Sequence, residues 1–286
     1  MEHRINTITL APFGQLPAVQ LIAPDGAQAI ITLFGAHLVS WKSAGGAEQL
    51  FCSARSALDG SRAIRGGVPV VFPQFNERGP GLRHGFARVC DWALVDSGTG
   101  AGDDGEGHAS GTAFAVFALE PHDLPRATAQ AWPHEFLLQL RVSVGGDKLA
   151  MAFEVHNRGA APFAFSCALH TYHLVDQVCD ARIDGLRDAA LAIGDPLDEI
   201  FFGVQPRLTL RAGAATRVLE QDGFTDAVVW NPGAANAAAL VDLEDDEYQR
   251  FVCIEPAVIA PVTLQGGESW RGNYLVGPGV GTGPQV

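Results

Sequence analysis

Residues 136–157 read FLLQLRVSVGGDKLAMAFEVHN, two apolar runs joined by four turn-forming residues. In both runs polar and apolar side chains alternate, which is typical of a strand with one face buried. The connecting segment 145–148, GGDK, contains two glycines that tolerate the backbone of a tight turn. The stretch therefore predicts a β-hairpin with strands at 136–144 and 149–157.

Runs of the same character recur along the whole chain, bounded by Gly, Pro, Asn and Asp. Long segments with a helical period of 3.6 residues do not occur. The pattern predicts an all-β protein, a large antiparallel sandwich or barrel with few short helices. The runs are AIITLFG, GVPVVF, AFAVFAL, FAFSCALH, RLTLRAG, AVVWN, FVCIEPAVI and NYLVG.

The length of 286 residues permits one large β domain or two smaller ones. Segment 97–111, SGTGAGDDGEGHASG, has no hydrophobic pattern and could serve as a linker, but strands of the same kind continue on both sides. We therefore interpret it as a surface loop. We predict a single domain over residues 1–276 and a flexible C-terminal tail over residues 277–286.

The composition excludes several classes of partner. A net charge of -13 argues against nucleic acid, because a phosphate backbone requires a broad basic surface. No stretch approaches the ~20 apolar residues that span a membrane, and the amino terminus lacks the pattern of a signal peptide. The five cysteines form no C-x-x-C pair, so we expect reduced thiols in core positions. A cytoplasmic monomer or weak homo-oligomer is the expectation.

Segment 59–88, DGSRAIRGGVPVVFPQFNERGPGLRHGFAR, contrasts with this acidic background. It contains five arginines in a chain with only 19 Lys plus Arg. Guanidinium groups match the oxygens of phosphate or carboxylate groups in bidentate geometry. The segment therefore predicts a local site for a small anion. Its arginines are Arg62, Arg65, Arg78, Arg83 and Arg88.

Four side chains are candidates for proton chemistry. His84 lies in RHGFAR, His170 ends the apolar run FAFSCALH, and His173 follows three residues later. An imidazole at a strand end can exchange a proton near neutral pH, although each of these histidines could equally be structural. The spacing of His170 and His173 would suit a metal on a helix, but on a strand the two face opposite sides, so we expect no metal site.

Glu255 interrupts the apolar run FVCIEPAVI. A carboxylate in apolar surroundings has a raised pKa and suits a general base. The alternative is an ion pair with an arginine of segment 59–88. Together, Glu255 and a histidine at a strand end would supply a base and an acid.

Other polar and aromatic residues are weaker candidates. Asp198 in DPLDEIFFG could bind a sugar hydroxyl or close a turn. The tryptophans are interpreted as core or rim residues, and the acidic run 244–248, EDDEY, as a solvated turn. No P-loop pattern is present, which disfavours nucleotide binding.

With these residues identified, the chain resembles the aldose 1-epimerase (galactose mutarotase-like) superfamily, and within it the hexose-6-phosphate mutarotase group. The resemblance extends from residue 34 to residue 257, and RGGVPVVFPQF together with HGFAR is its most specific part. The other matching pieces are FGAHLVSW, ALHTYH, DEIFF, VVWNP and FVCIEPA.

The resemblance implies a β-supersandwich that interconverts the α and β anomers of a hexose 6-phosphate, glucose 6-phosphate above all, without metal or cofactor. It implies His170 as the acid that protonates the ring oxygen and Glu255 as the base for the C1 hydroxyl. The remaining family roles fall on substrate-binding residues. These are His84 and Asp198 for sugar hydroxyls, Arg65 and Arg88 for the phosphate, Arg62 and Arg83 as helpers, and Gln74 of the FPQF motif.

Two alternatives remain open at this point. The same chemistry could act on unphosphorylated aldoses, in which case the arginine cluster would lack a purpose. The sandwich could also be a sugar-phosphate-binding module without turnover, because one fold hosts many functions.

Overall fold

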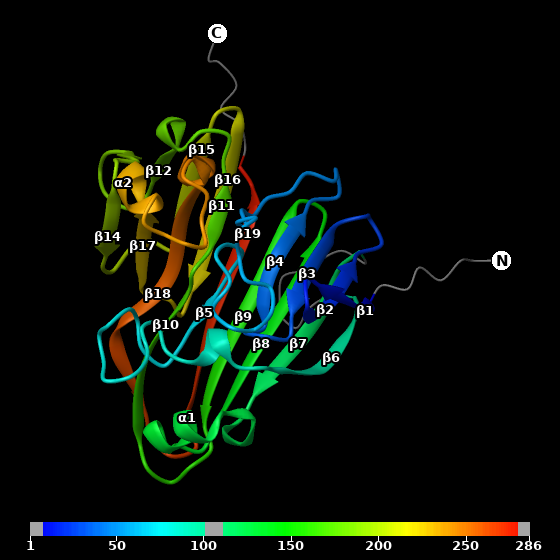
Figure 1. The fold of residues 1–286 in the computed structure, drawn as a ribbon, viewed down its shortest axis with the longest axis vertical. Helices are drawn as coiled ribbons and strands as arrows, with labels where there is room; N and C mark the ends of the chain where they lie inside the picture. The colour runs from blue at the N-terminus through cyan, green and yellow to red at the C-terminus, as the bar shows by residue number, and fades with distance from the viewer. Residues whose placement is uncertain (1–7, 101–110, 280–286) are drawn as a thin grey trace, which may run out of the picture.

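The computed structural model describes residues 8–100 and 111–279, and the order of its elements is that of an all-β protein (Figure 1). The prediction of antiparallel sheets with few short helices is confirmed. The strands are β1 (Ile8–Phe13), β2 (Leu16–Ile22), β3 (Gln28–Thr32), β4 (His37–Lys42), β5 (Val70–Val71), β6 (Ala93–Thr99), β7 (Ala113–Leu119), β8 (Phe136–Gly145), β9 (Lys148–Asn157), β10 (Phe163–Leu169), β11 (Tyr172–Leu174), β12 (Arg182–Asp184), β13 (Leu191–Ala192), β14 (Leu197–Phe201), β15 (Arg207–Ala212), β16 (Ala215–Asp222), β17 (Asp226–Asn231), β18 (Phe251–Leu264) and β19 (Ser269–Pro278), and the α-helices are α1 (Arg126–Ala131) and α2 (Gly233–Ala237).

The predicted hairpin is formed by β8 and β9, whose register runs from Phe136 opposite Asn157 to Gly145 opposite Lys148. Both strands are longer than expected, because Gly145 and Lys148 belong to them and leave a two-residue turn. Gly146, the first turn residue, has a φ of 59°, a left-handed conformation that glycine adopts without strain. This hairpin lies at the centre of the largest sheet.

Three sheets make up the described chain. The nine-stranded sheet has the order β13-β12-β15-β16-β19-β9-β8-β7-β6, and a four-stranded sheet has the order β1-β2-β3-β4. The third sheet has the order β14-β17-β18-β10-β5, with β11 paired to β18. In Figure 1 the third sheet (β14, β17 and β18) and the sheet β1–β4 lie towards opposite sides of the view.

The main core fills the space between these sheets. Phe165 of β10 meets Trp270 of β19 with ring centroids 5.6 Å apart, which joins the third sheet to the nine-stranded sheet. Phe72, directly after β5, packs edge-on against Phe153 of β9. Burial of this many aromatic and aliphatic side chains is the dominant stabilising term of such a fold.

The third sheet has two different faces. Along β18, Val252 and Ile254 belong to the main core, whereas Cys253 belongs to a separate cluster on the opposite face. Along β17, Val229 belongs to the main core and Val228 to a second outer cluster. Alternation along the strands thus turns every second side chain of this sheet away from the core.

Two expected boundaries differ from the structure. β19 continues to Pro278, so Gly277 and Pro278 are paired strand residues and not the start of a tail. The expected loop over 97–111 starts only after β6 ends at Thr99. Most of that loop and the end of the expected tail, 101–110 and 280–286, lie outside the described residues. No helix in the described part of the chain has the length and apolarity that a membrane span needs.

Candidate active site

A cleft of about 150 Å³ opens on the outer face of the third sheet. Its floor follows the strand register: Asp198 lies opposite Trp230, and Val228 opposite Glu255. The loop that follows β5 closes the cleft on the other side. The lining residues are Arg65, Phe75, Asn76, Arg83, His84, Arg88, His170, Asp198, Val228, Trp230, Leu240 and Glu255.

His170 and Glu255 form a buried pair at the bottom of this cleft. The Nε2 atom of His170 lies 3.3 Å from Oε1 of Glu255, and the two residues are 7% and 1% exposed. Among the described residues His170, and not an arginine of segment 59–88, is the ion-pair partner of Glu255. The structure therefore decides against the alternative considered from the sequence.

Burial shifts the pKa values of this pair in opposite directions. It raises the pKa of the Glu255 carboxyl well above its usual value, and the charge of Asp198 adds to this while Arg88 opposes it. It lowers the pKa of His170 well below its usual value, with further lowering by His84 and Arg88. The carboxylate thus becomes a stronger base and the imidazolium a stronger acid.

His84 is placed by an unusual backbone turn. Its φ of 62° is left-handed, and its amide N–H donates to the carbonyl of Asn76 at 2.9 Å. The amide N–H of Asn76 donates in return to Nδ1 of His84 at 3.3 Å. Burial and three nearby arginines lower the pKa of His84 to about 3, so the ring is neutral at pH 7. Since Nδ1 accepts, the proton resides on Nε2, which makes His84 a hydrogen-bond donor.

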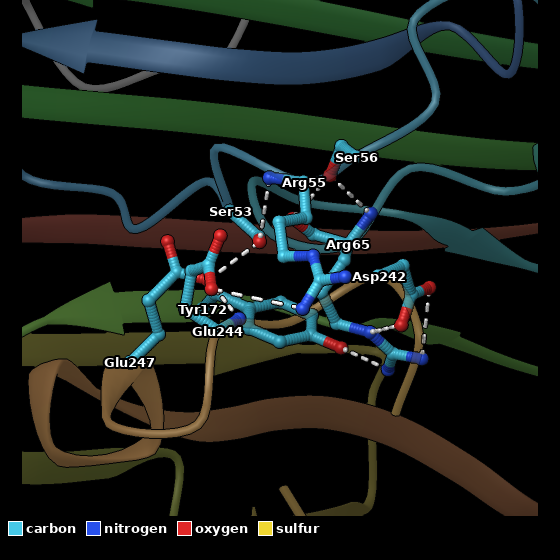
Figure 2. Close-up of polar contacts among 8 residues, drawn as sticks. All are labelled: Ser53, Arg55, Ser56, Arg65, Tyr172, Asp242, Glu244 and Glu247. Carbon is cyan, nitrogen blue, oxygen red and sulfur yellow. Dashed lines mark hydrogen bonds and ion pairs between the residues drawn. The ribbon is translucent and has the colours of Figure 1, made fainter. Parts of the chain in front are cut away.

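Arg65 is held by two partners on either side of its guanidinium group (Figure 2). Its Nε and Nη2 atoms each donate to a carboxylate oxygen of Asp242 at 3.2 Å, and Nη1 donates to the hydroxyl of Tyr172 at 3.1 Å. The carboxylate compensates the charge of Arg65, and most of its donors are in use.

The two glycines after Arg65 explain the RGG motif. Gly66 has a φ of 120° and lies against the backbone of Cys52, and Gly67 has a φ of 59° and lies against the carbonyl of Leu38. A Cβ atom at either position would collide with main-chain atoms. This close approach fixes the chain that presents Arg65.

Arg88 has fewer partners than Arg65. Its Nη2 donates to the carbonyl of Arg83 at 2.9 Å, and its buried Nε has no partner among the described residues. Burial lowers the pKa of Arg88 to about 10, and the charges of Arg65 and Arg83 contribute to that shift. Arg88 is thus a protonated, poorly compensated cation at neutral pH, the kind of group that an anion stabilises.

The remaining sequence candidates lie away from the cleft. Arg62 and Arg78 are exposed, and neither lines it. Gln74 is buried behind the loop, where its amide donates to the carbonyls of Asn76, Gly79 and Gly81 and accepts from the N–H of Gly81. His173 points into the core, 3.1 Å from the hydroxyl of Tyr274. The expected opposite orientation of His170 and His173 is confirmed.

Several features were not recognised from the sequence. Trp230, interpreted as a core or rim residue, lines the cleft, and its place in VVWNP within an alternating strand was the available signal. The acidic run 244–248 is only partly a solvated turn, because Glu247 accepts from the Ser53 hydroxyl at 2.6 Å. Of the five free thiols, Cys52 is half-buried and Cys179 exposed, so two are not core residues.

Chemically, the cleft combines an acid/base pair, two uncharged or anionic hydrogen-bonding groups and a group of cations. The family model described as aldose 1-epimerase matches residues 17–192. The chain belongs to the aldose 1-epimerase family. It is therefore an isomerase of the mutarotase type, which interconverts the anomers of a sugar.

Curated relatives agree with this family. The chain is 32% identical over 269 residues to a protein of Cenchrus ciliaris, covering 86% of this chain and 80% of the relative. It is 31% identical over 268 residues to a protein of Escherichia coli, covering 85% and 84%. Both relatives carry the name "Putative glucose-6-phosphate 1-epimerase".

Solved structures of the same fold are also similar. A Salmonella typhimurium protein described as a "putative mutarotase (YeaD)" superposes with a TM-score of 0.84 at 26% identity, covering 98% of this chain and 96% of that one. A galactose mutarotase-like protein from Clostridium acetobutylicum superposes with a TM-score of 0.71, covering 95% and 98%. At 16% identity the second likeness concerns the fold alone.

Proposed function

We propose that this aldose 1-epimerase acts on a hexose 6-phosphate, glucose 6-phosphate above all, with His170 and Glu255 as its acid and base. The observation that supports this most is the pairing of two chemistries in one cleft. The buried His170–Glu255 pair lies among the lining residues together with Arg65, Arg83 and Arg88. The names of the relatives support the same substrate.

The acid/base pair accounts for ring opening. Glu255 removes the proton of the C1 hydroxyl, the O–H electrons form the C1=O1 double bond, and the C1–O5 electrons leave to O5. His170, in its protonated form, donates a proton to O5 in the same step. The pair holds one proton in total before and after the step. Rotation about C1–C2 and the reverse transfers then close the ring on the other face.

The distance between the two groups suits this reaction. O1 and O5 are both bonded to C1, so the acid and the base must reach atoms that lie close together. Nε2 of His170 and Oε1 of Glu255 are 3.3 Å apart in the free protein. Two groups held at that separation can address both oxygens of one carbon without a large movement of either.

The other groups of the cleft would fix the ring. His84 offers an N–H donor, Asp198 offers a carboxylate acceptor, and the Trp230 indole lies beside Arg65, whose guanidinium carbon is 5.9 Å from the ring centroid. Donors, acceptors and an aromatic face are the features that bind the hydroxyls and the C–H face of a pyranose. We assign sugar-hydroxyl contacts to His84 and Asp198.

Among the arginines, Arg88 is proposed as the main phosphate ligand. Arg65 already satisfies Asp242 and Tyr172, whereas Arg88 retains a free buried Nε. Arg83 lies at the exposed end of the cleft and Arg62 outside it, so both are assigned secondary roles at most. A phosphate bound here would hold the sugar in register for the transfers at C1.

Anomer exchange measured by NMR saturation transfer tests this proposal. Glucose 6-phosphate, galactose 6-phosphate, glucose and galactose are compared at equal concentration with the same enzyme sample. We expect faster exchange over buffer for the phosphorylated sugars, with glucose 6-phosphate the best substrate. Equal acceleration of glucose and glucose 6-phosphate would assign the protein to unphosphorylated aldoses, and saturable binding without acceleration would leave a binding module.

A further inference from the structure

The acid/base pair has a thiol beside it. Cys253 lies two residues before Glu255 on β18 and therefore on the same face of the sheet. One ring nitrogen of His170, Sγ of Cys253 and one carboxylate oxygen of Glu255 all lie within 4.8 Å of one another, and all three residues are buried. We propose that these three residues bind a thiophilic divalent cation such as Zn²⁺, which shuts off the acid/base pair reversibly.

The donor set is the one that zinc prefers. A thiolate, an imidazole and a carboxylate bind Zn²⁺ at about 2.0–2.3 Å, which places tetrahedral ligand atoms roughly 3.3–3.5 Å apart. His170 and Glu255 already meet this spacing at 3.3 Å. The widest separation in the cluster must shorten by roughly 1 Å, which small side-chain rotations provide. Three protein ligands leave the fourth position to water.

Two polar atoms of the cluster are available as ligands. Nδ1 of His170 and Oε2 of Glu255 are buried and have no hydrogen-bond partner within the described chain. Buried polar atoms without a partner are rare in folded proteins. A cation would satisfy one or both of them, and this observation is independent of the spacing of the three ligands.

The charge balance permits a cation despite the neighbouring arginines. Binding replaces the thiol proton: Cys–SH and Zn²⁺ become Cys–S–Zn, and the proton leaves to solvent. With the Glu255 carboxylate, the two anionic ligands cancel the charge of the ion. The cluster gains at most one unit of positive charge relative to a metal-free state with Glu255 ionised. Arg65 and Arg88 therefore oppose binding only weakly.

Metal binding and catalysis exclude each other at this position. His170 and Glu255 line the cleft, whereas Cys253 lies beneath them and is fully buried. An ion bound to His170 and Glu255 occupies the groups that would exchange protons with the sugar. Inhibition is consequently competitive with the sugar phosphate, and removal of the ion by a chelator restores activity.

Direct binding is tested without any assay of activity. The protein, freed of metal with EDTA, is titrated with Co²⁺ to detect the thiolate-to-cobalt charge-transfer absorption, and with Zn²⁺ by calorimetry. Cys253→Ala and Cys253→Ser are compared with Cys179→Ser, which removes the exposed thiol outside the cluster. We expect the absorption in the parent and in Cys179→Ser but not in the Cys253 variants, whose Zn²⁺ affinity falls roughly tenfold or more.

An inhibition series completes the test, and this arm alone rests on the proposed function. The Zn²⁺ concentration that halves anomer exchange should rise at least tenfold in either Cys253 variant and stay unchanged in Cys179→Ser. Absence of the charge-transfer band in the folded parent, or equal Zn²⁺ affinity in the parent and both Cys253 variants, overturns the inference. A band in a protein that exchanges no anomers would refute the proposed function while the metal site stands.

Discussion

At the scale of single residues, the account depends on how burial changes the proton affinities of His170 and Glu255. Burial disfavours the charged form of each group, so it raises the pKa of Glu255 and lowers that of His170. Both shifts favour transfer from the C1 hydroxyl to Glu255 and from His170 to O5. A water-exposed pair of the same residues would lack this bias.

Replacement of the proposed base is the clearest test of this assignment. Glu255→Gln keeps the shape of the side chain but cannot accept the proton, so we expect the turnover number to fall roughly 10²- to 10⁴-fold. Saturation-transfer NMR with glucose 6-phosphate measures the rate, and circular dichroism checks the fold. His170→Asn should cause a loss of similar size, and the double variant little more, because the two groups act as a unit. Additive losses would show two independent roles.

The sequence indicated these two residues because each interrupts an apolar run, where a polar side chain needs a reason. The sequence did not indicate Asp242 or Tyr172 as partners of Arg65, because a guanidinium group pairs with residues far away along the chain. Arg65 and Asp242 are separated by 177 positions. Which arginine remains available for an anion is a consequence of such partners and cannot be deduced from an arginine-rich segment alone.

At the scale of elements, the loop from Gln74 to His84 positions one wall of the cleft. The Gln74 amide fastens it from behind through the carbonyls of Asn76 and Gly79 and both main-chain groups of Gly81. The reciprocal bonds between Asn76 and His84 close it at the other end. Gln74 thus acts on the site through the loop and not by facing the cleft.

Gln74→Ala is expected to loosen this loop while the acid/base pair stays intact. Loss of the buried amide leaves main-chain groups unpaired, which costs about 1–3 kcal/mol in the free energy of unfolding. We expect the KM for glucose 6-phosphate to rise several-fold, roughly 3- to 10-fold for a loss of ~1 kcal/mol in positioning, with a smaller change in kcat. Steady-state kinetics and urea unfolding provide the two readouts. A loss confined to kcat would instead place Gln74 at the reacting atoms.

Strands were easier to predict than the pieces between them. Alternation of apolar and polar residues identifies β8, β9, β10 and β18 because one face of each is buried against the main core. The segment that follows β17 has no such periodicity, yet it supplies Asp242 to Arg65 and Glu247 to Ser53. Its structure is set by contacts with distant loops, which a local pattern does not contain.

At the scale of the whole molecule, neutral buried histidines couple stability to pH. Burial lowers the pKa of His37 from 6.5 to about 4 and that of His173 to about 3. As the pH falls below 6.5 the unfolded chain takes up these protons, while the folded protein does not until the lower values are reached. The stability is thus fully present above pH 6.5 and is lost progressively towards pH 4.

Urea unfolding at pH 7, 6 and 5 measures this dependence. Each of the two histidines should contribute a slope of up to about 1.4 kcal/mol per pH unit below pH 6, or roughly 3 kcal/mol for His37 over its whole window. His173→Gln should reduce the slope, whereas His122→Gln, whose side chain is 73% exposed, should leave it unchanged. An identical slope in all three proteins would mean that His173 is not held neutral in the folded state.

The all-β class could be predicted from the sequence because strand patterns persist over the whole chain. The order of strands within each sheet could not, since β10 pairs with both β5 and β18 across long separations in sequence. That order brings Asp198, Trp230, Glu255 and His170 to one outer face. The cleft is therefore a property of the sheet as a whole.

The central claim, that a phosphate on Arg88 directs the sugar to the acid/base pair, is tested by four kcat/KM values. They are those of the parent and of Arg88→Ala, each with glucose 6-phosphate and with glucose, and Arg62→Ala provides a control from the same segment outside the cleft. We predict a loss of roughly 30- to 1000-fold in Arg88→Ala with glucose 6-phosphate, about 2–4 kcal/mol, because a buried charge pair is broken. With glucose the same variant should change less than about threefold. Equal losses with both sugars, or no loss with either, would contradict the account.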